Sequence, residues 1–583
     1  MKHTRLIAFI GFCGSIGCAF AQGDTLSRSV TVEREFQPII QPVGKVNASP
    51  SRLEIQEPQV EVKYSDVIEQ DSSTHNAQPM RFVNTPLPKQ DKWDGHLDVA
   101  AGHSNTYLDF GYSVPVSGKG SKGVKLDLYA HHDAAWGLKT WEETKVGMNF
   151  VKQFSSLETY LNVSGKNTFF TRYGRYWSLD KNGLSIRHFS DLKKDDKQSI
   201  WTVNVNAGVR SRKNADILYD VELGYQAFVL PNLVSEHQAR TRANVEWNGD
   251  EHRVGGNIYL QNAFYAVQEE LWADKDTSHV IRPRHALRIN PYYRYVGDRL
   301  RARVGVNLDV NFGKGQMMSS NSEISFAPSP DVYLEYHIVP QWLAVYGGAT
   351  GKFSTGTLDG YMATCPYRNI ARGVASDHVS SYTPVDAFVG FKIRPTDNLL
   401  LDIYAGYAFM KNQIIFYVDS TSLKPGGFVH YEYCDYQRWK VGMELTYHYQ
   451  DIIHITASGN YYHWIPENME LENHEKGFDP NAVYDHPSWD AHLRIDAHIN
   501  SQWSLYSDNN FCGSVKSVAQ IYGEVKELKS KPMIDLNIGV RYDWKKNIGF
   551  YVQLNNYINR YNDILFSYQT PGIHGVFGVS WKF

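Results

Sequence analysis

Strict alternation of apolar and polar residues is the feature that most constrains what this chain can fold into. The stretch "LRARVGVNLDVNF" at residues 300–312 alternates over thirteen positions. One face carries leucine, alanine, valine and phenylalanine, and the other carries mainly arginine, asparagine and aspartate, because successive side chains of a strand point to opposite sides. Strands of soluble sheets average about five or six residues. A strand of this length suits a tilted crossing of a hydrocarbon core.

The same alternation recurs along the chain, for example in residues 439–449, 491–500 and 533–544. A charge on a lipid-facing side would cost about 2 to 4 kcal/mol near the bilayer midplane. We therefore expect the polar faces to point into the lumen of a barrel. The residues predicted to line the lumen include Arg301, Arg303, Asp309, Arg494, Asp496 and Arg541.

Two kinds of connection alternate between the predicted strands. Tight turns are predicted near residues 118–121, 155, 250, 299, 341, 397, 451, 501 and 546, and long polar stretches at about 168–197, 267–284, 356–385, 465–489 and 513–531. Outer-membrane barrels have short periplasmic turns and long extracellular loops, and pairing by this rule predicts about 22 strands, within a range of about 16 to 22. The predicted fold class is all-β, a transmembrane antiparallel β-barrel. A secreted sandwich or propeller is the alternative, but no blade repeat is visible.

The start of the chain predicts export. Residues 1–21 combine a basic leader, an apolar stretch, and alanines at positions 19 and 21, which is the pattern of a cleaved signal peptide. A lipoprotein at Cys18 is the alternative interpretation, although Ser15 stands where such sites usually carry leucine. Cleavage would leave Cys365, Cys434 and Cys512, an odd number that allows at most one internal disulfide without indicating which.

Residues 22–92 form the second predicted region, an extended proline-rich periplasmic segment. They contain seven prolines and charges of both signs, with no sustained helical or strand period. The barrel is predicted to occupy residues 93–583, with the outer membrane of a Gram-negative bacterium as its location and outer-membrane lipid as its surroundings.

Composition excludes several classes of function. The chain has 59 basic and 62 acidic side chains, so it offers no electrostatic footprint for nucleic acid. After the leader, no apolar run approaches the roughly 18 residues of a spanning helix.

No motif indicates an enzyme, a cofactor or a metal site. The glycines of 118–123 are followed by a strand and not by the helix that nucleotide binding needs, so they predict a hairpin turn. His454 and Ser458 lie roughly 13 Å apart on one strand face, too far to share a proton. The histidines and glutamates of 463–474 match no defined ligand spacing, which favours a solvated loop.

The last strand carries aromatic residues at alternate positions and ends in phenylalanine: Phe577, Trp581 and Phe583. This pattern resembles the signal that outer-membrane proteins present to the barrel-assembly machinery. We expect these three residues to form that signal.

Strand count, terminal phenylalanine and leader together resemble the barrel of TonB-dependent receptors, over most of residues 95–583. The resemblance implies transport or ligand reception across the outer membrane, with TonB or another periplasmic protein as partner. Such receptors carry a short TonB box near the mature N-terminus, where this chain has Ser29, Val30, Thr31, Val32 and Glu33. β-branched residues in an extended segment suit strand addition to a partner's sheet edge. A plain linker is the alternative.

One departure from the receptor pattern concerns the plug. The receptors have a folded plug well over a hundred residues long, whereas only 71 residues lie between the cleavage site and Trp93, so we expect no conventional plug. Two other functions therefore stay open: a non-conducting structural or assembly scaffold that binds partners such as a surface lipoprotein, and a passive porin. Prolines that stiffen the tail also predict docking at the periplasmic mouth. The docking residues predicted are Phe36, Pro38, Ile39, Ile40 and Pro42.

Overall fold

A computed structural model gives the fold of the region after the proline-rich segment. It describes residues 94–583 apart from 115–122, 137–140, 172–174, 181–182, 189–196, 213–214, 232, 268–282, 314–323, 366–379, 420–427, 451, 471–478, 480, 522–523 and 566–567. Among the described residues, no helix has the length and apolar character needed to cross a membrane.

Long antiparallel strands form a closed barrel, and there are 22 of them in the described chain. They are β1 (Gly95–Gly102), β2 (Asn105–Val114), β3 (Val124–Ala135), β4 (Trp141–Gln153), β5 (Leu157–Thr171), β8 (Lys197–Ser211), β9 (Ile217–Leu230), β10 (Val234–Asn248), β11 (His252–Val267), β12 (Arg284–Val296), β13 (Leu300–Phe312), β14 (Ile324–Val339), β15 (Leu343–Ser354), β16 (Ser381–Thr396), β17 (Leu399–Asp419), β18 (Phe428–Tyr449), β19 (Ile453–Glu470), β20 (Trp489–His498), β21 (Trp503–Cys512), β24 (Met533–Lys545), β25 (Ile548–Asn555) and β28 (His574–Lys582). The predicted fold class and strand number are thus confirmed.

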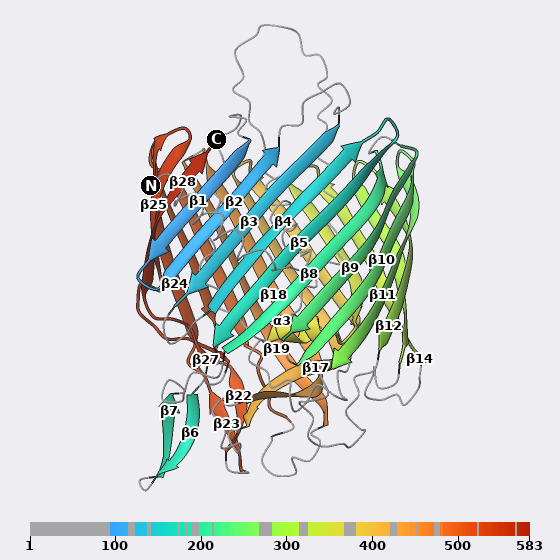
Figure 1. The fold of residues 1–583 in the computed structure, drawn as a ribbon. Helices are drawn as coiled ribbons and strands as arrows, with labels where there is room; N and C mark the ends of the chain where they lie inside the picture. Colours follow the sequence, from blue (N-terminus) through green and yellow to red (C-terminus); the bar gives the residue numbers. More distant parts are fainter. Residues whose placement is uncertain are drawn as a thin grey trace.

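Shorter elements lie in the long loops. They are the hairpins β6–β7 (Arg175–Asp180, Gly183–His188), β22–β23 (Lys516–Ile521, Glu524–Lys529) and β26–β27 (Asp563–Leu565, Tyr568–Gln569), and helix α3 (Leu358–Thr364). Figure 1 shows the first two hairpins beyond one end of the tilted strands, opposite the end at which the chain finishes.

The barrel closes where the first strand meets the last. β1 pairs antiparallel with β28, from His96 opposite Lys582 to Gly102 opposite Val576. Beyond this ladder, the backbone N–H of Gly95 donates to the carbonyl of Phe583 at 2.8 Å, and the N–H of Phe583 donates back at 3.0 Å. Closure leaves no unpaired strand edge in the wall, which a lipid environment requires.

The two faces of the wall differ as the alternation predicts. On β13, Val304 is 50% exposed on the outer face, while Asp309 on the other face is 3% exposed. Leu223, Phe326 and Val441 are further apolar residues exposed on the outer surface. An apolar outer surface around a polar interior is the arrangement of a membrane barrel.

Most connections alternate in length as predicted, but two outer connections are short: two residues join β1 to β2, and three join β9 to β10. Short periplasmic turns join the strands at 154–156, 249–251, 297–299, 340–342, 397–398, 450–452, 499–502 and 546–547. The turn expected at 118–121 lies outside the described residues, and the short connection between β8 and β9 was not predicted. Several long loops are shorter than expected, because β5 continues to Thr171, β19 continues to Glu470 and β16 already begins at Ser381. Strands that project into water need no apolar face. Their ends are therefore polar and lack the alternation from which strands were predicted.

Strands β17 and β18 project beyond their neighbours, with lengths of 21 and 22 residues. β22 pairs in parallel with the end of β17. Asp485, in the loop before β20, accepts the backbone N–H of Phe416 at 2.6 Å and the hydroxyl of Ser517 at 3.0 Å. Burial raises the pKa of Asp485 to about 7. This carboxyl group therefore joins the loop, β17 and β22 into one outer structure.

Glycines on the inner face accommodate tyrosine rings from the neighbouring strand. A Cβ atom at Gly578 would lie 2.1 Å from the ring of Tyr551, and one at Gly208 would lie 2.3 Å from Tyr160. The same contact recurs at Gly147 with Tyr129, Gly390 with Tyr346, Gly442 with Tyr404, and Gly539 with Tyr506. Because a larger residue has no room there, each pair favours one register of its strands.

Candidate functional site: the lumen and its outer closure

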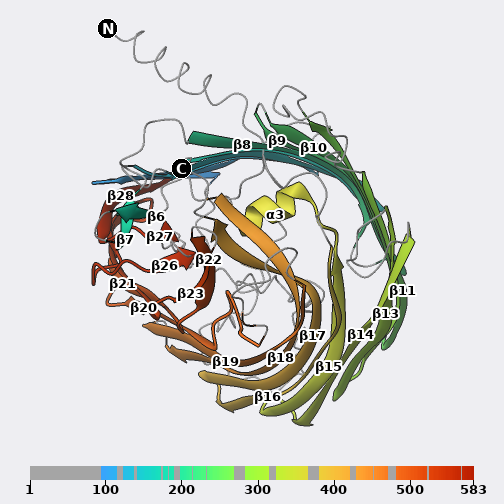
Figure 2. The same ribbon diagram turned by 90° about the horizontal axis from the view of Figure 1, so that it is seen from below.

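Helix α3 lies inside the ring of strands, as Figure 2 shows from the end that carries the long loops. It belongs to the connection between β15 and β16. Its buried side chains Leu358 and Met362, together with Cys365, form one apolar cluster with residues of other strands. These residues are Phe170, Ile200, Phe228, Leu230, Val234 and Phe416. The helix therefore packs against two separate parts of the wall, β5 to β10 and β17.

A buried carboxylate from the wall holds the start of α3. Glu236 of β10 accepts the backbone N–H of Leu358 at 2.5 Å and that of Asp359 at 3.3 Å. Thr357 is the N-cap, and its hydroxyl accepts the N–H of Gly360 at 3.3 Å. These acceptors satisfy N–H groups that a helix leaves unpaired at its start. The seven-residue helix is thus fixed by the opposite strand as well as by its own cap.

Asp359 is the second carboxyl group at this contact. Burial and, to a smaller extent, the charge of Glu236 raise the pKa of Asp359 to about 7, although Arg240 and Lys166 act in the opposite direction. At the other side of the helix, the hydroxyls of Tyr361 and Tyr433 are 2.8 Å apart. The contact between α3 and the wall is therefore apolar in its middle and polar at both sides.

Ion pairs between neighbouring strands cover the inner face of the wall. Arg303 donates to Asp331 at 2.9 Å, and its guanidinium lies 3.8 Å from the centre of the Tyr292 ring. Asp309 accepts from Arg288 at 2.8 Å. These pairs place charge of both signs side by side and hold adjacent strands together.

Glu335 of β14 is a shared acceptor on the same wall. Lys392 of β16 donates to it at 2.8 Å, and Arg301 lies 3.9 Å from it. Arg301 thus belongs to a group of charges that spans several strands and not to an isolated pair.

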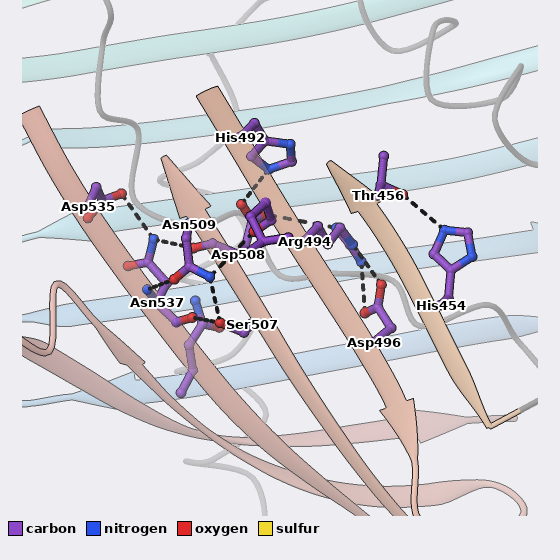
Figure 3. A network of polar contacts seen from close by, with 12 residues as sticks. His454, Thr456, His492, Arg494, Asp496, Ser507, Asp508, Asn509, Asp535 and Asn537 are labelled. Carbon is purple, nitrogen blue, oxygen red and sulfur yellow. Dashed lines mark hydrogen bonds and ion pairs between the residues drawn. The ribbon is translucent and has the colours of Figure 1, made fainter. Parts of the chain in front are cut away.

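A second polar group lies on β20, β21 and β24, and Figure 3 shows it from close by. Arg494 donates to Asp496 at 2.8 Å and lies 3.8 Å from Asp508, which also contacts His492 at 2.8 Å. Nearby, Arg541 donates to Asp543 at 2.9 Å. All six residues that the sequence suggests for the lumen therefore have an ionic partner on the wall.

Three of the partners, Arg288, Asp331 and Glu335, were not predicted from the sequence, and neither was α3. Arg288, Asp331 and Glu335 lie on polar faces of the alternating pattern, so their orientation could have been predicted but their pairing could not. For α3, the signal available was Thr357 as an N-cap followed by Asp359 in the first turn.

The C-terminal aromatic residues lie along β28. Phe577 and Trp581 are exposed on the outer surface. The rings of Trp581 and Phe583 are 4.8 Å apart, and Phe583 also stacks on Tyr112 of β2 at 5.9 Å. The terminal residue therefore packs across the seam of the barrel.

The remaining sequence-predicted residues fall outside the described part of the chain. These are the TonB-box-like residues 29–33 and the tail residues 36–42, together with the leader and the proline-rich segment. Cys365, Cys434 and Cys512 are buried thiols, and no disulfide joins them in the described chain.

Solved structures with this fold are outer-membrane receptors and transporters. The ferripyoverdine receptor of the outer membrane of Pseudomonas aeruginosa superimposes with a TM-score of 0.59 and 11% identity, covering 85% of this chain and 72% of the receptor. The copper transporter OprC gives a TM-score of 0.58 and 11% identity, with coverages of 87% and 81%. The siderophore receptor PirA from Acinetobacter baumannii gives 0.60 and 11%, with coverages of 85% and 81%.

Comparison by sequence gives no relative. No protein-family model matches the chain, and no curated protein matches it. At the identities above, the structural likeness establishes the fold: a closed 22-stranded barrel of the outer-membrane receptor type.

Proposed function

We propose that this chain is an outer-membrane receptor or transporter of the TonB-dependent kind, whose lumen is closed on the outer side by α3. The observation that carries the proposal is the position of α3 within the barrel, packed on β5 to β10 and on β17. A passive porin needs an unobstructed lumen. A helix held by a short apolar contact and a few hydrogen bonds can instead be released when a ligand or partner binds.

The wall supports a role in moving or receiving a polar solute. Its inner face presents paired charges and tyrosine rings, such as Arg303 with Asp331 and Tyr292. Proteins of this fold include a siderophore receptor and a copper transporter, which favours reception or transport over a purely structural role.

Energy for release would come from the periplasmic side. Residues 29–33 would add a strand to TonB or to another periplasmic protein. Residues 33–44 would dock at the periplasmic mouth or on that partner, in place of a conventional plug. The outer membrane of a Gram-negative bacterium, reached through the leader and the barrel-assembly machinery, is the location that this function requires.

Conductance in planar bilayers tests the closure. We expect the full chain to conduct weakly and a variant with residues 356–379 replaced by a short Gly-Ser linker to open large channels. Removing hairpin β6–β7 is the matched control, because that hairpin lies beyond the outer end of the barrel (Figure 1). Large channels in the unaltered protein would instead support a porin, and no effect of the α3 replacement would refute closure by α3.

Deletion of residues 24–60 tests the periplasmic tail. We expect the barrel to assemble normally, with loss of binding to a periplasmic partner or with leakage measured as antibiotic sensitivity. Co-purification of a surface lipoprotein, without solute flux in proteoliposomes, would favour the scaffold. A deletion strain that neither leaks nor loses a partner would show that the tail is only a linker.

A further inference from the structure

Two histidines and two aspartates meet on the inner wall next to the barrel seam. His96 and Asp98 lie two residues apart on β1 and therefore share a face. The strand register places Asp98 opposite Asp109 of β2, and Asp109 opposite His131 of β3. One nitrogen of His96 and one oxygen from each aspartate all lie within 4.8 Å of one another.

Asp109 contacts two imidazoles and is not paired with a guanidinium, unlike Asp309 and Asp331. Its two oxygens contact imidazoles on both sides, His96 Nε2 at 3.2 Å and His131 Nδ1 at 3.5 Å. By contrast, Asp309 is paired with Arg288 and Asp331 with Arg303. An imidazole carries a positive charge only when it is protonated, whereas a guanidinium is always charged.

The backbone of β2 fixes the direction of His96. Gly111 lies opposite it in the register, and a Cβ atom there would be 2.4 Å from the ring of His96. The absent side chain lets the imidazole lie across β2 toward Asp109. On the other side, Tyr107 packs edge-on against the ring of His131 at 5.2 Å. Both imidazoles are therefore held in place by their neighbours.

Two basic side chains bring positive charge near the cluster. Arg541 interacts electrostatically with Asp98, and Lys582 interacts electrostatically with His96. Arg541 also donates to Asp543 at 2.9 Å, and Asp98 has a hydrogen bond with Ser580. Two carboxylates among imidazoles thus favour an additional positive charge.

We propose that His96, Asp98 and Asp109 bind a divalent first-row transition-metal ion on the lumen wall, with His131 as a positioning residue. Nitrogen and oxygen ligands in this mixture suit Zn²⁺ or Co²⁺, whereas Mg²⁺ and Ca²⁺ prefer oxygen alone. Metal–ligand distances are about 2.0 to 2.2 Å, so each of the three ligand atoms would have to move by less than about 1 Å toward a central ion. His131 would hold the other oxygen of Asp109 and so orient the ligand.

The site would exchange its ion with the lumen. The His96 side chain is 44% exposed, so water completes the coordination and the ion can enter and leave, unlike the closed four-ligand sites that only hold structure. The inference does not depend on whether the barrel conducts.

Metal titration of the purified full chain tests the proposal. The protein carries a tag without histidines, is stripped with EDTA, and is titrated with Zn²⁺ against a chromophoric chelator; Co²⁺ is added separately to record its visible d–d absorption. We expect one saturable site, abolished in Asp109→Asn and weakened by about ten- to hundredfold in His131→Gln. His131→Gln should keep the shape of the Co²⁺ spectrum, since the residue only positions a ligand.

A matched histidine provides the control. His492 also contacts an aspartate, Asp508, at 2.8 Å, but Arg494 lies beside that carboxylate. We expect His492→Gln to bind Zn²⁺ like the unaltered chain. Heat-modifiable migration identifies folded barrel in every variant, and His96→Gln replaces Asp109→Asn if the latter does not fold. The proposal is overturned if the unaltered chain shows no saturable Zn²⁺ binding or Co²⁺ band, or if His492→Gln weakens binding as much as His96→Gln.

Discussion

Docking of α3 is expected to weaken as the pH rises. Asp359 is buried between α3 and the wall beside Glu236, and the pKa of its carboxyl group is about 7 in the docked helix. An aspartate in water has a pKa of about 3.9. The docked state therefore favours the protonated form, and its stability is greatest below about pH 4 and is lost progressively up to about pH 7.

The size of the effect follows from this difference in pKa. Each unit corresponds to about 1.4 kcal/mol, so three units give at most ~4 kcal/mol of docking free energy between acid and neutral pH. Asp359→Asn removes the ionisable group while nearly preserving its shape. Ionisation of Asp359 should cost the unaltered helix about 1.4 kcal/mol of docking free energy between pH 6 and pH 8, which is about tenfold in the population of the undocked state, and the variant lacks this loss. Any change with pH that both proteins share cancels when they are compared.

The thiol of Cys365 provides the assay. It is buried in the cluster under α3, so its alkylation by iodoacetamide requires undocking. Mass spectrometry of peptides separates it from Cys434 and Cys512, which report any general loosening. Because thiolate content rises with pH in both proteins, the measured quantity is the alkylation rate of the unaltered chain divided by that of Asp359→Asn.

We expect this ratio to be about ten times higher at pH 8 than at pH 6. Asp250→Asn, in an exposed periplasmic turn, should give a ratio that does not change with pH. A constant ratio for Asp359→Asn would refute the reasoning, because the carboxyl group would then not titrate between docked and undocked states.

Three further outcomes concern assembly, topology and packing. Phe583→Ser should reduce accumulation in the outer membrane and leave protein in the periplasm; normal heat-modifiable barrel would count against the C-terminal signal. An epitope inserted near residue 475 should bind antibody on intact cells, and one near residue 299 should not, so reversed labelling would disprove the assignment of the two ends. Gly578→Ala should lower the free energy of unfolding of the barrel by ~1 to 3 kcal/mol, because the new methyl group would overlap with a tyrosine ring. Gly256→Ala, whose nearest neighbour would be 3.7 Å away, is the control, and equal loss in both would contradict the packing argument.

Alternation predicts most of the wall because a strand with lipid on one side and polar groups on the other has two distinct faces. Residues 300–312 were predicted as one strand and form β13 with the same bounds. The loop hairpins and α3 could not be predicted in this way. Seven residues are too few to display a helical period, and α3 depends on Glu236, which is more than a hundred positions away in the chain.

The histidine and aspartate cluster illustrates a second limit. The spacing of His96 and Asp98 places both on one face, which the sequence alone predicts. Asp109 joins them only because β1 and β2 pair with Asp98 opposite Asp109. A shift of one residue would turn Asp109 toward the lipid. Spacing rules for metal sites therefore fail where the ligands come from different strands.

Each strand of the wall pairs with the wall strands before and after it in the chain, and β1 pairs with β28. The strands therefore form a closed ring, in which any strand could come first. Residues 95 and 583 exchange backbone hydrogen bonds, so a short peptide can join them. The chain can then be opened at another periplasmic turn, such as 340–342, to give a circular permutant. Every strand pair would persist, but a different strand would emerge last. Such a permutant separates two roles that β28 now combines, sealing the wall and presenting the final aromatic strand to the assembly machinery.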